Sequence, residues 1–174
     1  TAPFATIESV KISLRPWPLL KSQVILDQVE IGKFNVSLKR FADGTTNFDD
    51  LISKDDSPST LQFDLSGITV KNGSLQFDDA LAQRKTQIAN LQLTSGRLTE
   101  NVTAPIRAQF LLTNDNPAAS LRTQFDIELI FDLKRKRYQL NRTKVKAQGE
   151  GSGMKPLAID LEASIDWVAS GHAD

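Results

Sequence analysis

Residues 68–77 read Ile-Thr-Val-Lys-Asn-Gly-Ser-Leu-Gln-Phe, two short alternations of apolar and polar side chains joined by one odd step. Alternation is typical of a strand with one buried face and one face in water. The odd step falls at Asn72 and Gly73, where a glycine frees the backbone for a bulge or a tight bend. This stretch therefore predicts a bent strand that buries only one face.

The same pattern recurs in three other segments, which are residues 29–38, 91–98 and, more weakly, 138–147. In the segment 91–98 the odd step falls at Gly96, and we expect the backbone to use the freedom of that glycine in a second bend. The pattern predicts a succession of bent, one-sided strands. A function based on an extended apolar sheet face is favoured over a catalytic cluster.

Two longer stripes, Leu121 to Phe131 and Leu157 to Trp167, alternate in the same way. At ~3.4 Å per residue the first stripe spans roughly 37 Å, more than an ordinary strand. Helical periodicity is rare, and only residues 47–53 favour a short helical turn, with Asn47 as its N-cap. We therefore predict a mostly-β fold: a long, twisted, largely antiparallel sheet that forms an open groove or a sandwich, with at most one or two short helices.

Composition fits one folded domain. The chain has 174 residues, 40% of them apolar and 24% charged, which is ordinary for a globular protein. We expect a single β-rich domain over residues 1–174, with residues 168–174 as a flexible tail. Basic and acidic side chains number 21 each, a balance that argues against a nucleic-acid partner. The absence of cysteine excludes disulfides, thiol nucleophiles and thiolate metal sites.

The sequence has no apolar run of about 18 residues, the length that a membrane-spanning helix needs. It opens at Thr1 without an initiator methionine or a leader segment. We interpret the chain as a fragment of a longer protein, with any anchor outside it.

Catalytic and metal-binding motifs are weak. The single histidine, His172, lies within three residues of the end, where a tail is the better interpretation. Adjacent aspartates occur at 49/50, 55/56 and 78/79, but neighbouring side chains on a strand point to opposite faces and no EF-hand spacing is present. We therefore predict no enzyme activity, no catalytic residue, no metal site and no cofactor.

Charge is uneven along the chain. Residues 43–79 carry eight acids and two lysines, whereas residues 134–146 carry seven basic side chains and no acid. The run Lys134, Arg135, Lys136, Arg137 is typical of a hairpin tip. Two interpretations stay open: a solvated turn whose charge protects a sheet edge, or a contact with anionic lipid head groups.

Long strands with one apolar face need a cover, and almost no amphipathic helix is available to supply it. The cover is another sheet, which gives a closed sandwich or barrel, more of the same protein, or a ligand, which gives an open curved sheet that holds lipid chains. In the last case the residues that we expect to contact lipid alternate along three strands: Phe110, Leu112, Phe125, Ile127, Leu129, Phe131, Leu161, Ile165 and Trp167.

Several motifs follow one another along the chain: residues 3–14, Trp17-Pro18-Leu19-Leu20, residues 29–40, the turn Asp43-Gly44-Thr45-Thr46-Asn47-Phe48-Asp49-Asp50-Leu51, and residues 68–78. In this order and spacing they resemble the AsmA family. The resemblance is good over residues 3–98 and thinner but compatible up to Trp167.

The resemblance implies a protein of the Gram-negative envelope, anchored in the inner membrane by an N-terminal helix that this chain lacks, with a periplasmic body. AsmA-like proteins are similar to the repeating β-groove, bridge-like lipid transfer proteins. We therefore expect a non-enzymatic periplasmic segment that takes part in phospholipid transport and outer-membrane biogenesis through an apolar β-groove. Its partners would be phospholipid acyl chains and other envelope-assembly proteins. The alternative is a structural or protein-interaction β-sandwich that acts as a scaffold in envelope assembly.

Overall fold

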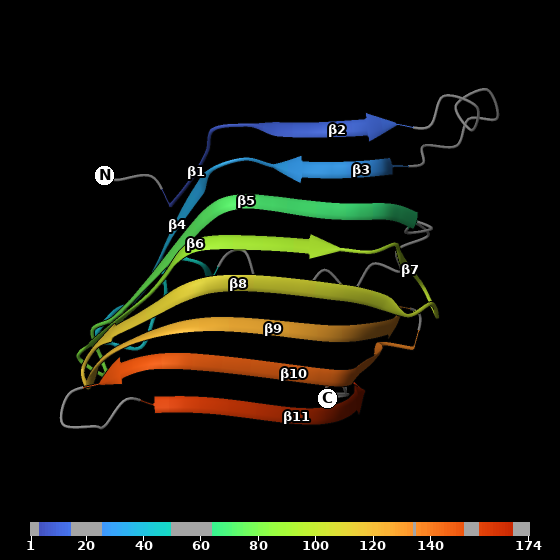
Figure 1. The fold of residues 1–174 in the computed structure, drawn as a ribbon. Helices are drawn as coiled ribbons and strands as arrows, with labels where there is room; N and C mark the ends of the chain where they lie inside the picture. The colour runs from blue at the N-terminus through green and yellow to red at the C-terminus, as the bar shows by residue number, and fades with distance from the viewer. Residues whose placement is uncertain (1–3, 15–25, 50–63, 134, 152–156, 169–174) are drawn as a thin grey trace, which may run out of the picture.

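The computed structural model describes residues 4–14, 26–49, 64–133, 135–151 and 157–168. These residues form one mixed sheet and contain no α-helix (Figure 1). No helix of the described part is long and apolar enough to cross a membrane. The strands are β1 (Ala5–Ile7), β2 (Val10–Leu14), β3 (Leu26–Ile31), β4 (Phe34–Arg40), β5 (Asp64–Asp79), β6 (Arg84–Ser95), β7 (Leu98–Thr99), β8 (Ala104–Asp115), β9 (Ala118–Asp132), β10 (Arg137–Gly151) and β11 (Leu157–Val168).

The main path through the sheet runs β1-β4-β5-β6-β8-β9-β10-β11. From β5 onward the long strands on this path pair antiparallel with one another. At the other side β3 and β4 both pair parallel with β5, one with each half of that strand, and they pair antiparallel with β2 and β1. The predicted long, twisted and largely antiparallel sheet is confirmed.

Bends occur where the sequence pattern has its odd step. The pairing of β5 with β6 shifts around Gly73, and the pairing of β10 with both neighbours shifts after Leu140. The segment 29–38 is interrupted at Gly32, between β3 and β4. At Gly96 the chain likewise leaves β6, and it pairs with β5 again from Leu98 in β7, so this odd step is also a break in the strand.

The backbone freedom at these bends lies on other residues than the expected glycines. Asn72, Asn90 and Arg142 have φ angles of 57°, 55° and 45°. Asparagine is the side chain that tolerates this left-handed region best after glycine. Gly73 is required for space instead, since a Cβ there would lie 2.5 Å from Cε1 of Phe34.

The segment after β4 begins as a turn. Residues 47 and 48 form this turn and residue 49 begins a 3₁₀ turn, whereas residues 50–53, which hold most of the predicted helical turn, lie outside the described part. The Asn47 side chain accepts a hydrogen bond from the Lys39 backbone N–H at 2.7 Å and donates one to the Ser37 carbonyl at 2.8 Å. Asn47 therefore pairs with β4 as a strand would, and it does not cap a helix.

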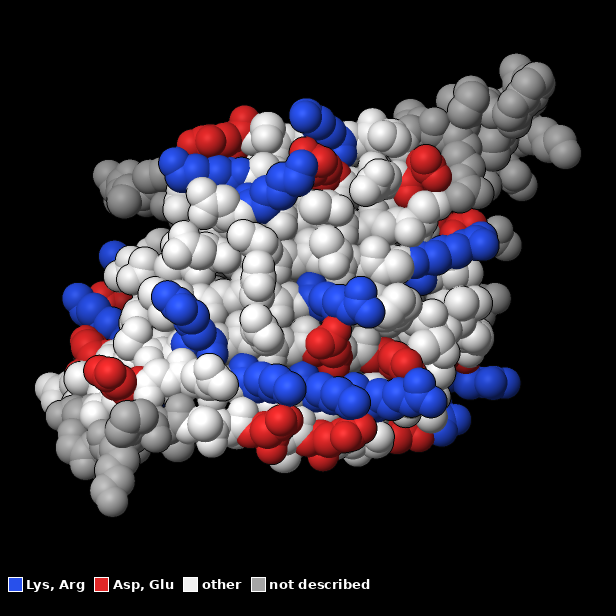
Figure 2. All heavy atoms as spheres, viewed as in Figure 1, with Lys and Arg blue, Asp and Glu red and all other residues white. Residues whose placement is uncertain are grey.

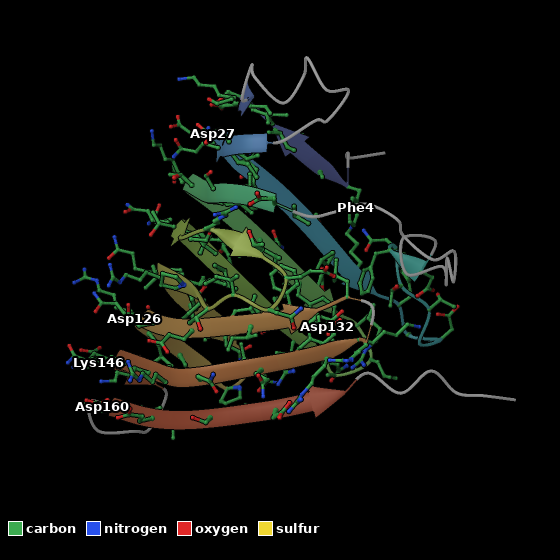
Figure 3. All side chains as sticks on the ribbon, turned by 90° about the vertical axis from the view of Figure 1, so that its right-hand side faces the viewer. Phe4, Asp27, Asp126, Asp132, Lys146 and Asp160 are labelled. Atoms are coloured by element: carbon green, nitrogen blue, oxygen red, sulfur yellow. The ribbon has the colours of Figure 1, made fainter. Side chains whose placement is uncertain are left out.

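The two faces of the sheet differ in chemistry. On one face, Ile106 lies opposite Ile127 and Ala108 opposite Phe125; on the other, Arg107 lies opposite Asp126. Figure 3 shows the sheet curved, with Asp126, Lys146 and Asp160 projecting from its convex side. We call the concave apolar face the inner face and the convex polar face the outer face.

The best-buried cluster lies at the end of the sheet where β7 folds across. It consists of Leu65, Leu98, Ala104 and Phe131, and Tyr138 packs against it. The Asn101 backbone N–H donates to the Phe131 carbonyl at 2.9 Å, which ties this loop to β9. Away from this cluster, much of the inner face has no second layer among the described residues.

Candidate functional site

The inner face is a continuous apolar surface that crosses the whole sheet. Strand register places its side chains in rows, because every second residue of each strand points to the same side. The rows include Ile12, Val29, Ile31, Val36, Leu38, Val70, Leu75, Phe77, Ile88, Leu93, Ile106, Phe110, Leu112, Leu121, Phe125, Ile127, Leu140, Val145, Ile159, Leu161 and Ile165.

The centre of this face is held by aromatic packing. The rings of Phe110 and Phe125 meet edge to face with centroids 5.9 Å apart. Phe125 lies between Ala108 on β8 and Val145 on β10. The small side chain of Ala108 leaves room for the ring, and Ala108 is itself buried. Curvature thus half-buries the central side chains without a covering layer.

The inner face becomes more exposed toward both edges of the sheet. Ile7 and Ile12, on β1 and β2, are 55% and 57% exposed. Leu161 and Ile165, on β11, are 52% and 50% exposed. Apolar side chains of this size gain free energy when they are removed from water, so these two regions can bind apolar ligand atoms.

The residues predicted to contact lipid all belong to strands β8, β9 and β11, and the pairing register places their positions on the inner face. Phe110, Leu112, Phe125 and Ile127 are partly buried along the centre. Leu129 and Phe131 belong to or pack against the buried cluster under β7, so we assign them to the core and not to the ligand surface. The side chain of Trp167 lies outside the described residues.

The predicted head-group residues are placed at the tip between β9 and β10, apart from Lys134, which lies outside the described residues. Arg135 lies 3.7 Å from Asp132, and Arg137 lies 2.6 Å from Asp166. The hydrogen bonds from Arg137 and Gln139 lower the pKa of Asp166, and Asp166 in turn raises the pKa of Arg137. Both arginines therefore pair with carboxylates at a tip that joins two inner strands of the sheet.

The basic segment 134–146 has a second set of partners that the sequence analysis missed. Lys144 and Lys146, on the outer face of β10, lie 4.0 Å and 3.7 Å from Glu162 and Asp160 of β11. Figure 2 shows the row of basic side chains with a row of acidic side chains below it. The sequence does show Asp160, Glu162 and Asp166 alternating with apolar residues. The pairing of β10 with β11 was needed to show that these acids lie beside the lysines.

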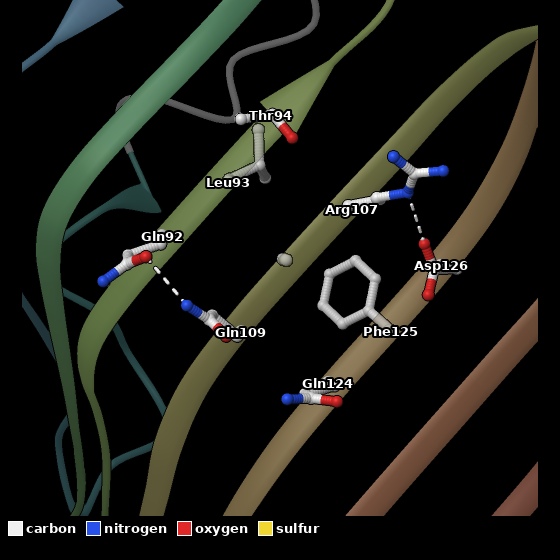
Figure 4. Close-up of a pocket in the computed structure, with 9 residues that line it drawn as sticks. Gln92, Leu93, Thr94, Arg107, Gln109, Gln124, Phe125 and Asp126 are labelled. Carbon is white, nitrogen blue, oxygen red and sulfur yellow. Dashed lines mark hydrogen bonds and ion pairs between the residues drawn. The ribbon is translucent and has the colours of Figure 1, made fainter.

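The outer face holds shallow polar depressions. The one in Figure 4 has a volume of about 310 Å³ and lies across β6, β8 and β9. Gln109 donates to Gln92 at 2.8 Å, and Arg107 donates to Asp126 at 2.8 Å. Four of the polar side chains that line the depression thus bond in pairs, and Thr94 and Gln124 line it as well. Within the described part of the chain, no three His, Cys, Asp or Glu side chains gather in a way that could hold a metal ion.

Comparison with protein families shows to which family the chain belongs. A model of the AsmA family matches residues 1–164. The chain belongs to the AsmA family. No curated protein and no solved structure matched the chain.

In this AsmA-family chain, the turn that carried much of the resemblance has a structural role. Asp43 accepts hydrogen bonds from the backbone and the hydroxyl of Thr45, and Asp49 accepts them from Thr46. These bonds lower the pKa of both carboxyls. Gly44 has a φ of 89°, which side-chain-bearing residues rarely adopt. The described residues of the motif therefore close the turn that follows β4.

Proposed function

We propose that this chain is a non-enzymatic segment of an AsmA-family envelope protein and that its inner face holds phospholipid acyl chains. One observation carries the proposal: a broad, concave apolar face whose edges stay about half exposed, with no covering layer among the described residues. A globular domain of this length ordinarily covers such a face with a second layer. A ligand with long apolar chains is the natural substitute.

The binding chemistry in this proposal is passive. Each CH₂ group removed from water stabilises the complex by about 0.8 kcal/mol, so a long acyl chain binds without any specific polar contact. Head groups stay in water beyond the rims of the sheet. Because no bond is made or broken, the proposal requires no catalytic residue and no cofactor.

Membership of the AsmA family supports the wider setting. In the full-length protein we place this segment in the periplasm, tethered to the inner membrane by an anchor outside the chain. Its role there is phospholipid transport and outer-membrane biogenesis, with other envelope-assembly proteins as partners. The equal numbers of basic and acidic side chains, 21 each, favour no nucleic-acid partner.

A second candidate function is a scaffold module for envelope assembly. The observation that favours it is the outer edge of β11, which pairs with no strand of the described part and can accept a strand from another protein. A scaffold of this kind needs no lipid, so bound lipid separates the two candidates.

The test is native mass spectrometry of protein purified without detergent, with a matched pair of variants. Leu161→Glu puts a charge on the exposed part of the inner face, and Ser164→Glu puts the same charge on the outer face of the same strand. Since both positions are exposed, both variants should fold. We expect phospholipid on the wild type and on Ser164→Glu, and severalfold less on Leu161→Glu.

Wild-type protein that carries no phospholipid, although it was expressed in a Gram-negative host, would contradict the proposal. Equal loss of lipid in both variants would show that charge alone, and not the inner face, controls binding.

A further inference from the structure

The last strand of the sheet, β11, is open along its full length. It has 12 residues, and within the described part of the chain only β10 pairs with it. The outward row of backbone N–H and C=O groups on such an edge is a template for another strand.

Apart from its three acidic side chains, this edge lacks the features that usually protect an edge strand. The sequence of β11 contains no lysine, proline or glycine, and the irregularity in its pairing belongs to β10, which has the extra residue. The opposite edge of the sheet is different, because β1 and β2 have three and five residues and are separated by Glu8 and Ser9. Short, interrupted edges resist pairing, whereas long regular ones invite it. The two edges are therefore not equivalent.

The inner side of β11 indicates one half of the chemistry of an incoming strand. Ile159, Leu161 and Ile165 are among the most exposed large apolar residues of the described part. A new strand beside β11 would place alternate side chains next to them. Those side chains must be apolar to continue the inner face.

The outer face of β11 indicates which side chains an incoming strand would place on that face. Along one row of this face the sign of the charge alternates from strand to strand: Arg107 on β8 pairs with Asp126 on β9, and Lys144 on β10 lies opposite Asp126. The acids of β11 follow, and Asp160 and Glu162 remain 73% and 65% exposed. In this row, the charges of β9 and β10 have opposite charges on both neighbouring strands, whereas the acids of β11 have opposite charges on one neighbouring strand, β10. The open flank therefore favours basic side chains.

The same charges disfavour a second copy of β11. Two β11 strands paired around a two-fold axis would set the acids Asp160, Glu162 and Asp166 against one another, and like charges that face each other across strands are destabilising. A symmetric dimer through this edge is not the expected occupant.

We infer that the open edge of β11 binds a polypeptide strand that alternates basic and apolar side chains, with the basic residues over the β11 acids and the apolar residues continuing the inner face. The inference is independent of whether the inner face carries lipid, because backbone pairing and the outer-face charges supply the contacts.

The test uses two labelled ten-residue peptides that differ only in charge: one alternates Lys with Val and Thr, and the other has Glu in place of every Lys. Binding to the 174-residue chain is measured by fluorescence anisotropy at low and high salt. We expect the Lys peptide to bind about tenfold more tightly, because several cross-strand ion pairs are exchanged for like-charge contacts. We also expect this preference to shrink at high salt.

The chain has no cysteine, so the edge that is used can be mapped with single cysteines. Ser164→Cys and Ser13→Cys place one thiol on the outer face of β11 and one on the outer face of β2. A Lys peptide that carries one cysteine should form a disulfide with Ser164→Cys and not with Ser13→Cys. The double variant Asp160→Asn, Glu162→Gln should weaken the binding of the Lys peptide while circular dichroism stays unchanged.

Three results would overturn the inference: equal binding of the two peptides, a disulfide at Ser13→Cys as readily as at Ser164→Cys, or Ser164→Cys protein that pairs with itself in preference to the peptide. The last result would identify a second copy of the chain as the occupant.

Discussion

At the scale of single residues, the ends of the strands are fixed by side chains that bond to the backbone. Asn47 is the clearest case, because its amide pairs with two backbone groups of β4 beyond the part that β1 covers. Asp79 is another: it is 1% exposed, and it accepts bonds from the Arg40 guanidinium and from the Ala82 backbone N–H. Both residues hold the loops around β4 and β5 in place.

The first prediction concerns Asn47. Asn47→Ala removes two hydrogen bonds to β4 and should lower the free energy of unfolding by about 1–2 kcal/mol. Asn47→Asp keeps the acceptor for the Lys39 N–H but sets a carboxylate oxygen against the Ser37 carbonyl oxygen, so it should destabilise the fold as well. Urea unfolding measures both. An Asn47→Ala variant as stable as the wild type would show that water replaces these bonds at no cost.

The second prediction concerns pH. The hydrogen bond from Arg40 holds the pKa of Asp79 below its ordinary value of 3.8, and the pKa values of Asp43, Asp49 and Asp166 are lowered as well. A lowered pKa in the folded state stabilises the fold above the ordinary pKa, and this contribution is lost as the pH falls through the folded value. The melting temperature should therefore be nearly level from about pH 7 to 5 and fall below about pH 4.

Asp79→Asn is the matching control for this pH dependence. It keeps an acceptor for the Ala82 N–H and removes one titrating group. The variant should be less stable than the wild type at neutral pH and should lose less stability on acidification. An acid-induced fall in melting temperature identical to that of the wild type would contradict the role of Asp79.

At the scale of elements, β5 bends where one residue has a left-handed backbone and the next residue is a glycine, which has no side chain. In β5 these positions are Asn72 and Gly73, and the ring of Phe34 from β4 occupies the space above Gly73. The bend is thus a joint property of two adjacent strands.

The third prediction tests this pairing. Gly73→Val would force its side chain into the Phe34 ring, and overpacking of this kind typically costs about 1–3 kcal/mol. Phe34→Ala alone should also destabilise the fold, but the double variant should be more stable than the sum of the two losses predicts. Chemical unfolding of all four proteins gives the coupling. Additive losses would show that Gly73 is needed for another reason.

Alternation along single strands was enough to predict the sheet, because the period of two residues fixes the faces of β8, β9 and β10 without any distant contact. The same signal placed Phe125 and Ile127 on the inner face. It could not predict the parallel pairing of β3 and β4 with β5, which joins residues about 40 positions apart. It also missed the burial of Phe131, since the cover comes from Leu98 in the short strand β7.

At the scale of the whole molecule, the sheet is a single curved layer with opposite chemistry on its two sides. A closed sandwich would bury both Phe125 and Ile127 completely, whereas here they are only partly buried. The described part of the chain therefore favours the open alternative of the two that the sequence left open.

The fourth prediction separates the two alternatives in solution. In an open layer, the charge of Ile127→Glu can reach water, so the protein should stay folded, with a modest fall in melting temperature and less bound phospholipid. In a closed core the same charge costs several kcal/mol, comparable with the whole stability of a domain, and the fold would be lost. Gln124→Glu, which places the same charge on the outer face of β9, is the control and should change neither quantity.

The direction of the strands determines how long an acyl chain the inner face can hold. The concave inner face runs across the strands, so its length depends on the number of strands, whereas its cross-section depends on where each strand bends. The eight strands of the main path are separated by seven spacings of ~4.8 Å, which gives a channel of roughly 34 Å. The hydrocarbon core of a bilayer is about 30 Å thick. The inner face of this one chain can therefore contact an acyl chain over a length similar to the thickness of the hydrocarbon core. Every further strand would lengthen the inner face by one strand spacing.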